Sequence, residues 1–227
     1  MRYRALLLDA DDTIFDFGAA EARAISEVIA FAGICDPRAA EVYSEINKGY
    51  WRRLERGEVT TAQLRVARFR DFAAAYDVDL EAEVLADAFV AALSRQRELI
   101  PGALETVAEI ARRMPVAIVT NGIAEVQHAR FDESPIMRHV AALVISGEVG
   151  CQKPDPRIVF HALERLGATA ADALLAGDGL QSDIRAAENA GVDACWYNPK
   201  GLRRPDGALI KYEIGDIREL SGIACAE

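Results

Sequence analysis

The sequence is poor in the features that mark secreted, disulfide-rich or membrane proteins. It has only four cysteines, widely spaced and without a C-x-x-C pair, which indicates free thiols in a reducing compartment. No run of about 18 apolar residues is present, so no ordinary membrane-spanning helix is expected. The apolar stretch behind the basic start MRYR is too short for a signal peptide. We therefore expect a cytoplasmic protein with no membrane partner.

Basic residues are also scarce. Lysine and arginine number 26 against 36 aspartates and glutamates, which gives a net charge of −10 and a sequence pI of about 4.9. Such a charge argues against nucleic acid polymers as the main partner, because a phosphate backbone requires basic patches. It is compatible with a small phosphorylated ligand, which needs only local positive groups. The three histidines, His128, His139 and His161, are scattered and suggest no metal-binding triad.

What the sequence does contain is a large apolar fraction arranged in short segments. Hydrophobic residues make up 51% of the chain and charged residues 27%, so a sizeable core is expected and global disorder is not. Helical patterns separate five short apolar segments that are typical of buried strands: 5–8, 116–119, 142–145, 173–176 and 194–197. Strands that alternate with helices and are buried on both faces predict a doubly wound α/β fold, a Rossmann-like parallel sheet.

Residues 17–98 interrupt this alternation. The interval shows no convincing strand and instead predicts about four helices, with starts near Ala19, Asp36, Thr60 and Asp79. We interpret it as a small all-α domain inserted behind the first strand. The predicted organisation is a Rossmann-like core of residues 1–16 and 99–227 with an inserted helical domain of residues 17–98.

Conspicuous polar residues follow the predicted strands at their carboxyl ends. Asp9 ends the first strand within the stretch LLLDADDTIFD, and Asp178 ends the fourth. Thr120-Asn121-Gly122 end the second strand, and Lys153 follows the third. Because open α/β sheets bind ligands at this edge, four separate segments that converge there predict one functional site.

The residue types at this edge suit the binding of a metal ion and a phosphoryl group. A hard divalent cation such as Mg²⁺ prefers oxygen ligands and would relieve the repulsion between the carboxylates of Asp9 and Asp178. Lys153 supplies a fixed positive charge beside them. A hydroxyl and backbone N–H groups, all suited to a phosphoryl group, come from Thr120, Asn121 and Gly122.

Two acids of the first segment suit the chemistry itself. Asp9 is positioned by its strand to attack phosphorus and form an aspartyl phosphate. Asp11 lies two residues on, and that spacing returns it to the same side of an extended chain. It therefore suits protonation of the leaving oxygen and later deprotonation of the hydrolytic water.

The four segments resemble the motifs of the haloacid dehalogenase-like hydrolase superfamily. Asp9-Ala10-Asp11-Asp12-Thr13 is similar to the D-x-D-x-T signature, Val119–Gly122 to the second motif, Lys153-Pro154 to the third, and Gly177-Asp178 with Asp183 to the fourth. The resemblance implies a nucleophilic Asp9 and an acid/base Asp11. It also implies Mg²⁺ held by Asp9, the backbone carbonyl of Asp11 and Asp178, with Asp183 as a ligand or a support. By the same resemblance, residues 17–98 are a helical cap that closes over the site.

Within the superfamily, the sequence is most similar to those of the pyrimidine 5′-nucleotidase group. This implies a Mg²⁺-dependent phosphomonoesterase that acts on nucleoside 5′-monophosphates through an aspartyl phosphate. A sugar-phosphate or phosphoglycolate-type phosphatase is an alternative with the same chemistry. A 2-haloacid dehalogenase is disfavoured, because those enzymes lack an acid at the position of Asp11. A binding protein that keeps the fold without turnover is the non-enzymatic alternative, although no motif position has been lost.

Other residues carry weaker predictions. In the helical interval, Asn47, Trp51 and Arg68 are candidates for recognition of a base or sugar. Cys151 and Arg157 form the C-x₅-R pattern of cysteine-dependent phosphatases, but two prolines remove N–H groups that such a loop needs. The basic residues of the 200–204 loop have no assigned role, and the sequence predicts no oligomeric state.

Overall fold

The computed structural model describes residues 2–226 and divides the chain into two compact units. The core unit comprises Met1–Asp16, Glu98–Ala124 and Phe131–Glu227, and the helical unit comprises Phe17–Arg97 and Glu125–Arg130. Among the described residues no helix is long and apolar enough to cross a membrane.

The core unit is built on a six-stranded sheet in which every neighbouring pair of strands is parallel. The strands are β1 (Ala5–Leu8), β2 (Val116–Thr120), β3 (Ala142–Ile145), β4 (Ala173–Gly177), β5 (Asp193–Tyr197) and β6 (Tyr212–Ile214). Their spatial order is β3-β2-β1-β4-β5-β6. The chain therefore winds outward on one side of β1 and then on the other, and the strand order reverses between β1 and β4, which is where such sheets bind ligands.

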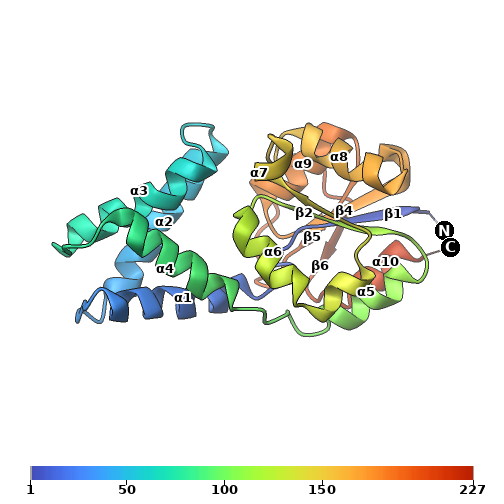
Figure 1. Cartoon of the computed structure of the whole chain (residues 1–227). Helices are drawn as coiled ribbons and strands as arrows, with labels where there is room; N and C mark the ends of the chain where they lie inside the picture. The colour runs from blue at the N-terminus through green and yellow to red at the C-terminus, as the bar shows by residue number, and fades with distance from the viewer. Residues whose placement is uncertain (1, 227) are drawn as a thin grey trace. The chain divides into compact units, whose positions relative to one another are not determined.

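Both faces of the sheet are buried, because successive side chains of each strand point to opposite sides. Leu6 and Leu8 of β1 belong to the cluster that includes helices α5 and α10, whereas Ala5 and Leu7 belong to the cluster that includes α8 and α9. Figure 1 shows these two helix layers on either side of the strands. A strand covered on both faces reads as a continuous apolar run rather than an alternating one, which explains the sequence ALLL.

Helices of the core unit cover both faces of the sheet, and most of them lie between successive strands. They are α5 (Ala103–Ala111), α7 (Ser146–Val149), α8 (Pro156–Leu166), α9 (Arg185–Ala190) and α10 (Glu219–Ala224). Helix α6 (Ala124–Asp132) follows β2, and its residues Glu125–Arg130 belong to the helical unit. Two 3₁₀ turns, η1 (Pro135–His139) and η2 (Ala170–Asp172), and one π-helical turn, η3 (Leu180–Ile184), complete the set.

The predicted α/β class and the five predicted strands are confirmed, each with bounds within one residue of those expected. Strand β6 is the sixth, and the sequence did not predict it. It has only three residues, at the edge of the sheet, and its middle residue is exposed. Its sequence YEI therefore lacks the apolar run by which the other strands were found.

The helical unit contains α1 (Phe17–Phe31), α2 (Ala39–Glu55), α3 (Thr61–Ala75) and α4 (Ala82–Ser94). The predicted helix start near Thr60 has a physical basis: its hydroxyl accepts a hydrogen bond from the Gln63 N–H, and the Gln63 side chain accepts one from the Thr60 N–H. This reciprocal capping box satisfies two backbone donors that the helix itself leaves unpaired. Within the unit, the rings of Tyr43, Phe69 and Phe89 lie 5.4–5.6 Å apart.

Candidate active site

The structure brings the predicted catalytic residues of the core unit together at the carboxyl edge of the sheet. Asp9 follows β1 directly, and its N–H donates to the carbonyl of Ala176 in the neighbouring β4. Thr120 is the last residue of β2, and Asp178 follows the last residue of β4. Parallel strands end at one edge, so residues more than 160 positions apart in sequence meet there.

Lys153 is the centre of this cluster. Its side chain is 2% exposed, and its ammonium donates to three acceptors: a carboxylate oxygen of Asp9, the carbonyl of Val119 at 2.7 Å and a carboxylate oxygen of Asp183 at 2.6 Å. All three donors of the ammonium group are therefore used. The other oxygen of Asp9, Oδ2, has no hydrogen-bond partner among the described residues, so Lys153 orients the carboxylate through one oxygen and leaves the other unpaired.

The charges in the cluster alter the pKa values of its members. Burial alone lowers the pKa of a lysine, but the neighbouring charges of Asp183 and Asp9 outweigh it and hold the pKa of Lys153 above its ordinary value. Burial and the charge of Asp183 raise the pKa of Asp9 well above its ordinary value, against the pull of Lys153. Burial, with the charges of Asp183 and Asp12, raises the pKa of Asp178 to about 7. One ammonium does not balance this many carboxylates, so the cluster favours a second cation.

Carboxylate oxygens of Asp9, Asp178 and Asp183 lie within 4.8 Å of one another. A small set of hard oxygen donors in a partly buried site fits Mg²⁺, which keeps several waters of its own. Asp183 differs from the other two, because one of its oxygens accepts from Lys153 and the other from the Gly179 N–H at 2.9 Å. Its contacts therefore favour the supporting role over that of a direct ligand.

The turn after β2 is held to the loop that carries Lys153. The Asn121 side chain donates to the carbonyl of Lys153 and accepts from its N–H, both at 2.9 Å. The expected role of Asn121 was its backbone N–H alone, so this clip by the side chain is a finding of the structure. The Thr120 hydroxyl accepts from the Gly122 N–H at 3.0 Å. That contact occupies the N–H of Gly122 within the turn, so this group is not the free phosphate donor that the sequence predicted, while the Thr120 hydroxyl keeps its own hydrogen as a donor.

The loop after β4 is shaped by residues that sequence reasoning did not assign to the site. The buried Thr13 hydroxyl accepts from the Asp178 N–H at 3.1 Å, and the Trp196 indole donates to the Asp178 carbonyl at 3.0 Å. Thr13 is the last letter of D-x-D-x-T, so the motif itself contained this signal. Nothing local marks Trp196, because it reaches the loop from β5.

Close approach of the Asp183 side chain explains the glycine at the end of β4. A Cβ placed on Gly177 would lie 2.4 Å from Cγ of Asp183 and 2.5 Å from one of its carboxylate oxygens. The chain then forms the π-helical turn η3, which carries Asp183, before α9 begins at Arg185. The absence of a side chain at residue 177 lets Asp183 come close to β4.

The first motif bends sharply after Asp9. Asp12 has a φ of 58°, a left-handed conformation that aspartate tolerates better than most residues. Its N–H donates to the carbonyl of Phe15 at 2.9 Å. This contact closes the turn that carries Asp11 and Asp12. Asp11 lies between Asp9 and Asp12 in this turn and is half-buried.

The candidate recognition residues of the helical unit form a buried polar network. Asn47 is 3% exposed and Arg68 2% exposed. Asn47 donates to Glu21 at 2.6 Å and accepts from Arg68 Nη1 at 2.8 Å. The guanidinium of Arg68 lies 4.7 Å from the ring centre of Phe89, a favourable cation–π arrangement. Trp51 is half-buried and packs against a separate apolar cluster of α2 and α3, so the structure joins two of the three residues and not the third.

The cysteine pattern does not build a thiol-based phosphatase site. Burial and the charge of Asp155 raise the pKa of the Cys151 thiol, whereas a nucleophilic cysteine requires a lowered one. Asp155 also binds the Arg157 side chain, with a shortest contact of 2.6 Å. The arginine of the pattern is therefore paired with a carboxylate.

Comparison with known proteins gives the classification. The profile of the haloacid dehalogenase-like hydrolases matches residues 3–191. The chain belongs to this family. The matched range includes all four motif segments, and the resemblance inferred from them is confirmed.

Relatives of nearly the same length narrow the chemistry. The HAD-hydrolase YfnB of Bacillus subtilis is 32% identical over 96% of this chain and 94% of its own, and its magnesium-bound crystal structure superposes with a TM-score of 0.91 over 99% of both chains. The pyrimidine 5′-nucleotidase YjjG of Escherichia coli is 29% identical over 99% of both chains. A 2-haloacid dehalogenase of Pseudomonas syringae is 25% identical with a TM-score of 0.73. Family membership and these relatives identify the chain as a hydrolase of the phosphatase type.

Proposed function

We propose that the protein is a Mg²⁺-dependent phosphomonoesterase that works through an aspartyl phosphate formed on Asp9, with nucleoside 5′-monophosphates as substrates. The observation that carries the proposal is the contact of one buried ammonium, Lys153, with both Asp9 and Asp183. It orients one carboxylate oxygen of Asp9 and leaves the other unpaired. A nucleophile held in this way has little conformational freedom to lose when substrate binds.

The proposed reaction has two steps, phosphorylation of Asp9 and hydrolysis of the aspartyl phosphate. In the first, Asp9 Oδ2 attacks phosphorus, the bond from phosphorus to the ester oxygen breaks, and Asp11 gives its proton to the leaving oxygen. In the second, Asp11 takes a proton from a water that attacks phosphorus, and the bond to Asp9 breaks to release inorganic phosphate. Lys153 and the hydroxyl of Thr120 stabilise the negative charge on the phosphoryl oxygens in both steps.

The donor set determines where Mg²⁺ belongs in this proposal. Asp9 and Asp178, with the backbone carbonyl of Asp11, would hold the ion, and Asp183 would hold Lys153. When bound, Mg²⁺ supplies positive charge that offsets the carboxylates and the incoming phosphate.

Phosphate release from a panel of esters, with Mg²⁺ or with a chelator, tests the proposal. We expect release that depends on Mg²⁺ and is abolished in Asp9→Asn, with Asp206→Asn, a fully exposed aspartate of the core unit, as the matched control. Release by Asp9→Asn at the wild-type rate contradicts the mechanism. Release of halide from a 2-haloacid without release of phosphate from any ester would instead support the dehalogenase alternative.

Two observations support nucleotides as the substrate class. Two of the relatives, YjjG of E. coli and PynA of Streptococcus pneumoniae, are named pyrimidine 5′-nucleotidases and align with 97–99% of this chain. In the helical unit, Nε and Nη2 of the buried Arg68 have no hydrogen-bond partner among the described residues. Buried donors without partners are costly, and a bound base or sugar would provide the missing acceptors.

The substrate profile tests this part separately. We expect Arg68→Met and Trp51→Ala to lower kcat/KM for nucleoside 5′-monophosphates more than for a small ester such as phosphoglycolate. Arg95→Met, which removes an exposed arginine of the same unit, is the control. An unchanged preference in both variants contradicts the assignment and favours the sugar-phosphate or phosphoglycolate alternative.

A further inference from the structure

A second pocket lies at the edge of the sheet opposite the candidate active site. It has a volume of about 280 Å³ and is lined by the end of α5, the η1 turn, the first residue of β2 and the residues just before β2 and β3. Val116, in its lining, begins β2, and Thr120 ends that strand at the candidate active site. Four residue steps along a strand correspond to about 13 Å. This hollow, which we call the distal pocket, is therefore separate from the catalytic residues.

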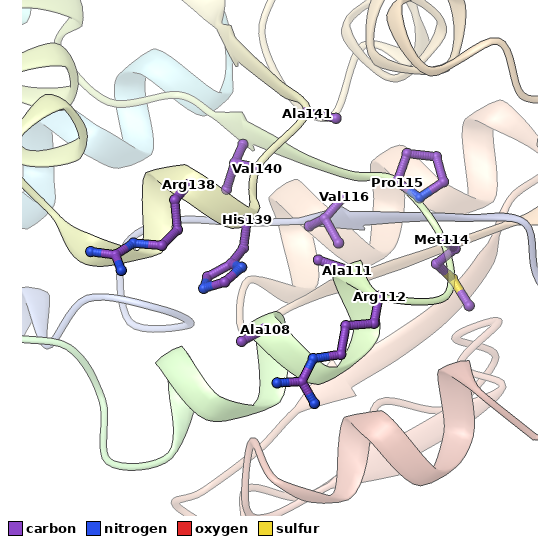
Figure 2. A pocket seen from close by; sticks show the side chains of 10 residues that line it. All are labelled: Ala108, Ala111, Arg112, Met114, Pro115, Val116, Arg138, His139, Val140 and Ala141. Atoms are coloured by element: carbon purple, nitrogen blue, oxygen red, sulfur yellow. The ribbon is translucent and has the colours of Figure 1, made fainter.

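Three basic side chains, two arginines and one histidine, line the distal pocket. Figure 2 shows His139 between Arg138, also on η1, and Arg112 at the end of α5. The remaining lining residues are all uncharged and mostly apolar. An excess of positive charge around a hollow is unexpected in a chain with a net charge of −10.

None of the three basic groups is neutralised. Among the described side chains, neither arginine makes an ion pair or side-chain hydrogen bond, and the His139 imidazole has no such partner either. Many other arginines of the chain are paired, among them Arg157 with Asp155 and Arg218 with Asp216. Glu109 lies one helical turn before Arg112 and still makes no ion pair with it. The guanidinium groups of the pocket are thus left for an external acceptor.

Helix ends give a partial alternative explanation for these residues. Basic side chains are favourable near the carboxyl end of a helix, and Arg112 caps α5 while Arg138 and His139 end η1. That effect accounts for a basic residue at each end. It does not account for the meeting of two such ends around one hollow that no acid enters.

We propose that the distal pocket binds a small phosphate-bearing anion. Two planar guanidinium groups suit the bidentate binding of phosphate oxygens, and His139 adds an N–H donor. The apolar floor, formed by side chains such as Ala108 and Val140, would cover the uncharged part of the molecule. This site is independent of the proposed reaction, because none of its residues takes part in it.

The scarcity of histidine makes a direct test possible. The chain has three histidines, so their imidazole C–H signals are readily resolved by NMR, and only His139 lines the pocket. Inorganic phosphate is titrated into the full-length protein at constant pH, with chloride at matched ionic strength as the reference. We expect a saturable shift of the His139 signal with phosphate and none with chloride, while His128 and His161 report any general change.

Substitutions then assign the shift to the pocket. Arg112→Gln and Arg138→Gln should each weaken the apparent phosphate affinity by about tenfold or more, since hydrogen bonds to charged groups are strong. Arg113→Gln removes the neighbouring exposed arginine that does not line the pocket and should leave the affinity unchanged. A His139 signal that does not move beyond the chloride reference overturns the proposal. The proposal is also overturned if the apparent phosphate affinity of both pocket variants equals that of the wild type.

Discussion

Replacing Asp178 by asparagine should make the metal-free protein more stable while removing its response to Mg²⁺. Burial and the charges of Asp183 and Asp12 raise the pKa of Asp178 from 3.8 to about 7. The difference between these values corresponds to about 4 kcal/mol of unfavourable free energy when the carboxylate is ionised in the folded state. Because the side chain is only half-buried, screening by water reduces this, and we expect a gain of about 2 kcal/mol in Asp178→Asn at neutral pH.

The pH dependence gives the sign of the effect. A carboxyl group whose pKa is raised by folding stabilises the fold when it is protonated, below about pH 4, and this contribution is lost as the pH rises through 7. The advantage of Asp178→Asn over the wild type should therefore be small near pH 4 and grow up to about pH 7.5. Urea denaturation of the metal-free proteins across this range measures it, with Asp206→Asn expected within about 0.5 kcal/mol of wild type.

Addition of Mg²⁺ should reverse the order. A ligand at a hundred times its Kd stabilises a protein by about 2.7 kcal/mol, so the wild type should gain and Asp178→Asn should not. A variant that is less stable than the wild type without metal at neutral pH, or equal stabilisation of both proteins by Mg²⁺, would contradict this prediction.

Three further predictions concern the same cluster. Asp11→Asn should lower steady-state turnover of alkyl phosphates about 10²–10⁴-fold. It should still give a rapid burst of nitrophenol from p-nitrophenyl phosphate, because that leaving group needs no proton. Loss of the burst would contradict the role assigned to Asp11. Lys153→Met should lower the free energy of unfolding of the metal-free protein by about 3–5 kcal/mol, because it leaves buried carboxylates unpaired, with the exposed Lys200→Met as control; a loss under about 1 kcal/mol would count against it. Gly177→Ala should abolish phosphate release, because the added Cβ would displace Asp183. Gly222→Ala is the control and should keep full activity, because the space around Gly222 is open. Equal rates of phosphate release in the two variants would contradict the prediction.

Periodicity predicted the fold well wherever burial was continuous. Strands β1 and β3 have the expected bounds. The weak points were short or edge elements. Strand β6 has no apolar run, and the π-helical turn η3 depends on the approach of Asp183 to Gly177, a contact between residues that local propensity does not register.

The site shows the same division between local and tertiary information. The positions of polar residues at strand ends were enough to predict that Asp9, Lys153 and Asp178 lie close together, because parallel strands end at the same edge of the sheet. The clip of Asn121 on the Lys153 backbone and the Trp196 contact with Asp178 were not predicted. Both depend on side-chain directions in loops, which a sequence pattern does not determine.

Covalent labelling of Asp9 tests the central claim most directly. The enzyme is mixed with a phosphate ester, quenched within one turnover and treated with borohydride, which reduces an aspartyl phosphate to homoserine. The tryptic peptide of residues 5–23 is then sequenced by mass spectrometry. We predict homoserine at position 9 alone, and only in the presence of both substrate and Mg²⁺. Full turnover with an unmodified Asp9, or with the modification on another residue, would contradict it.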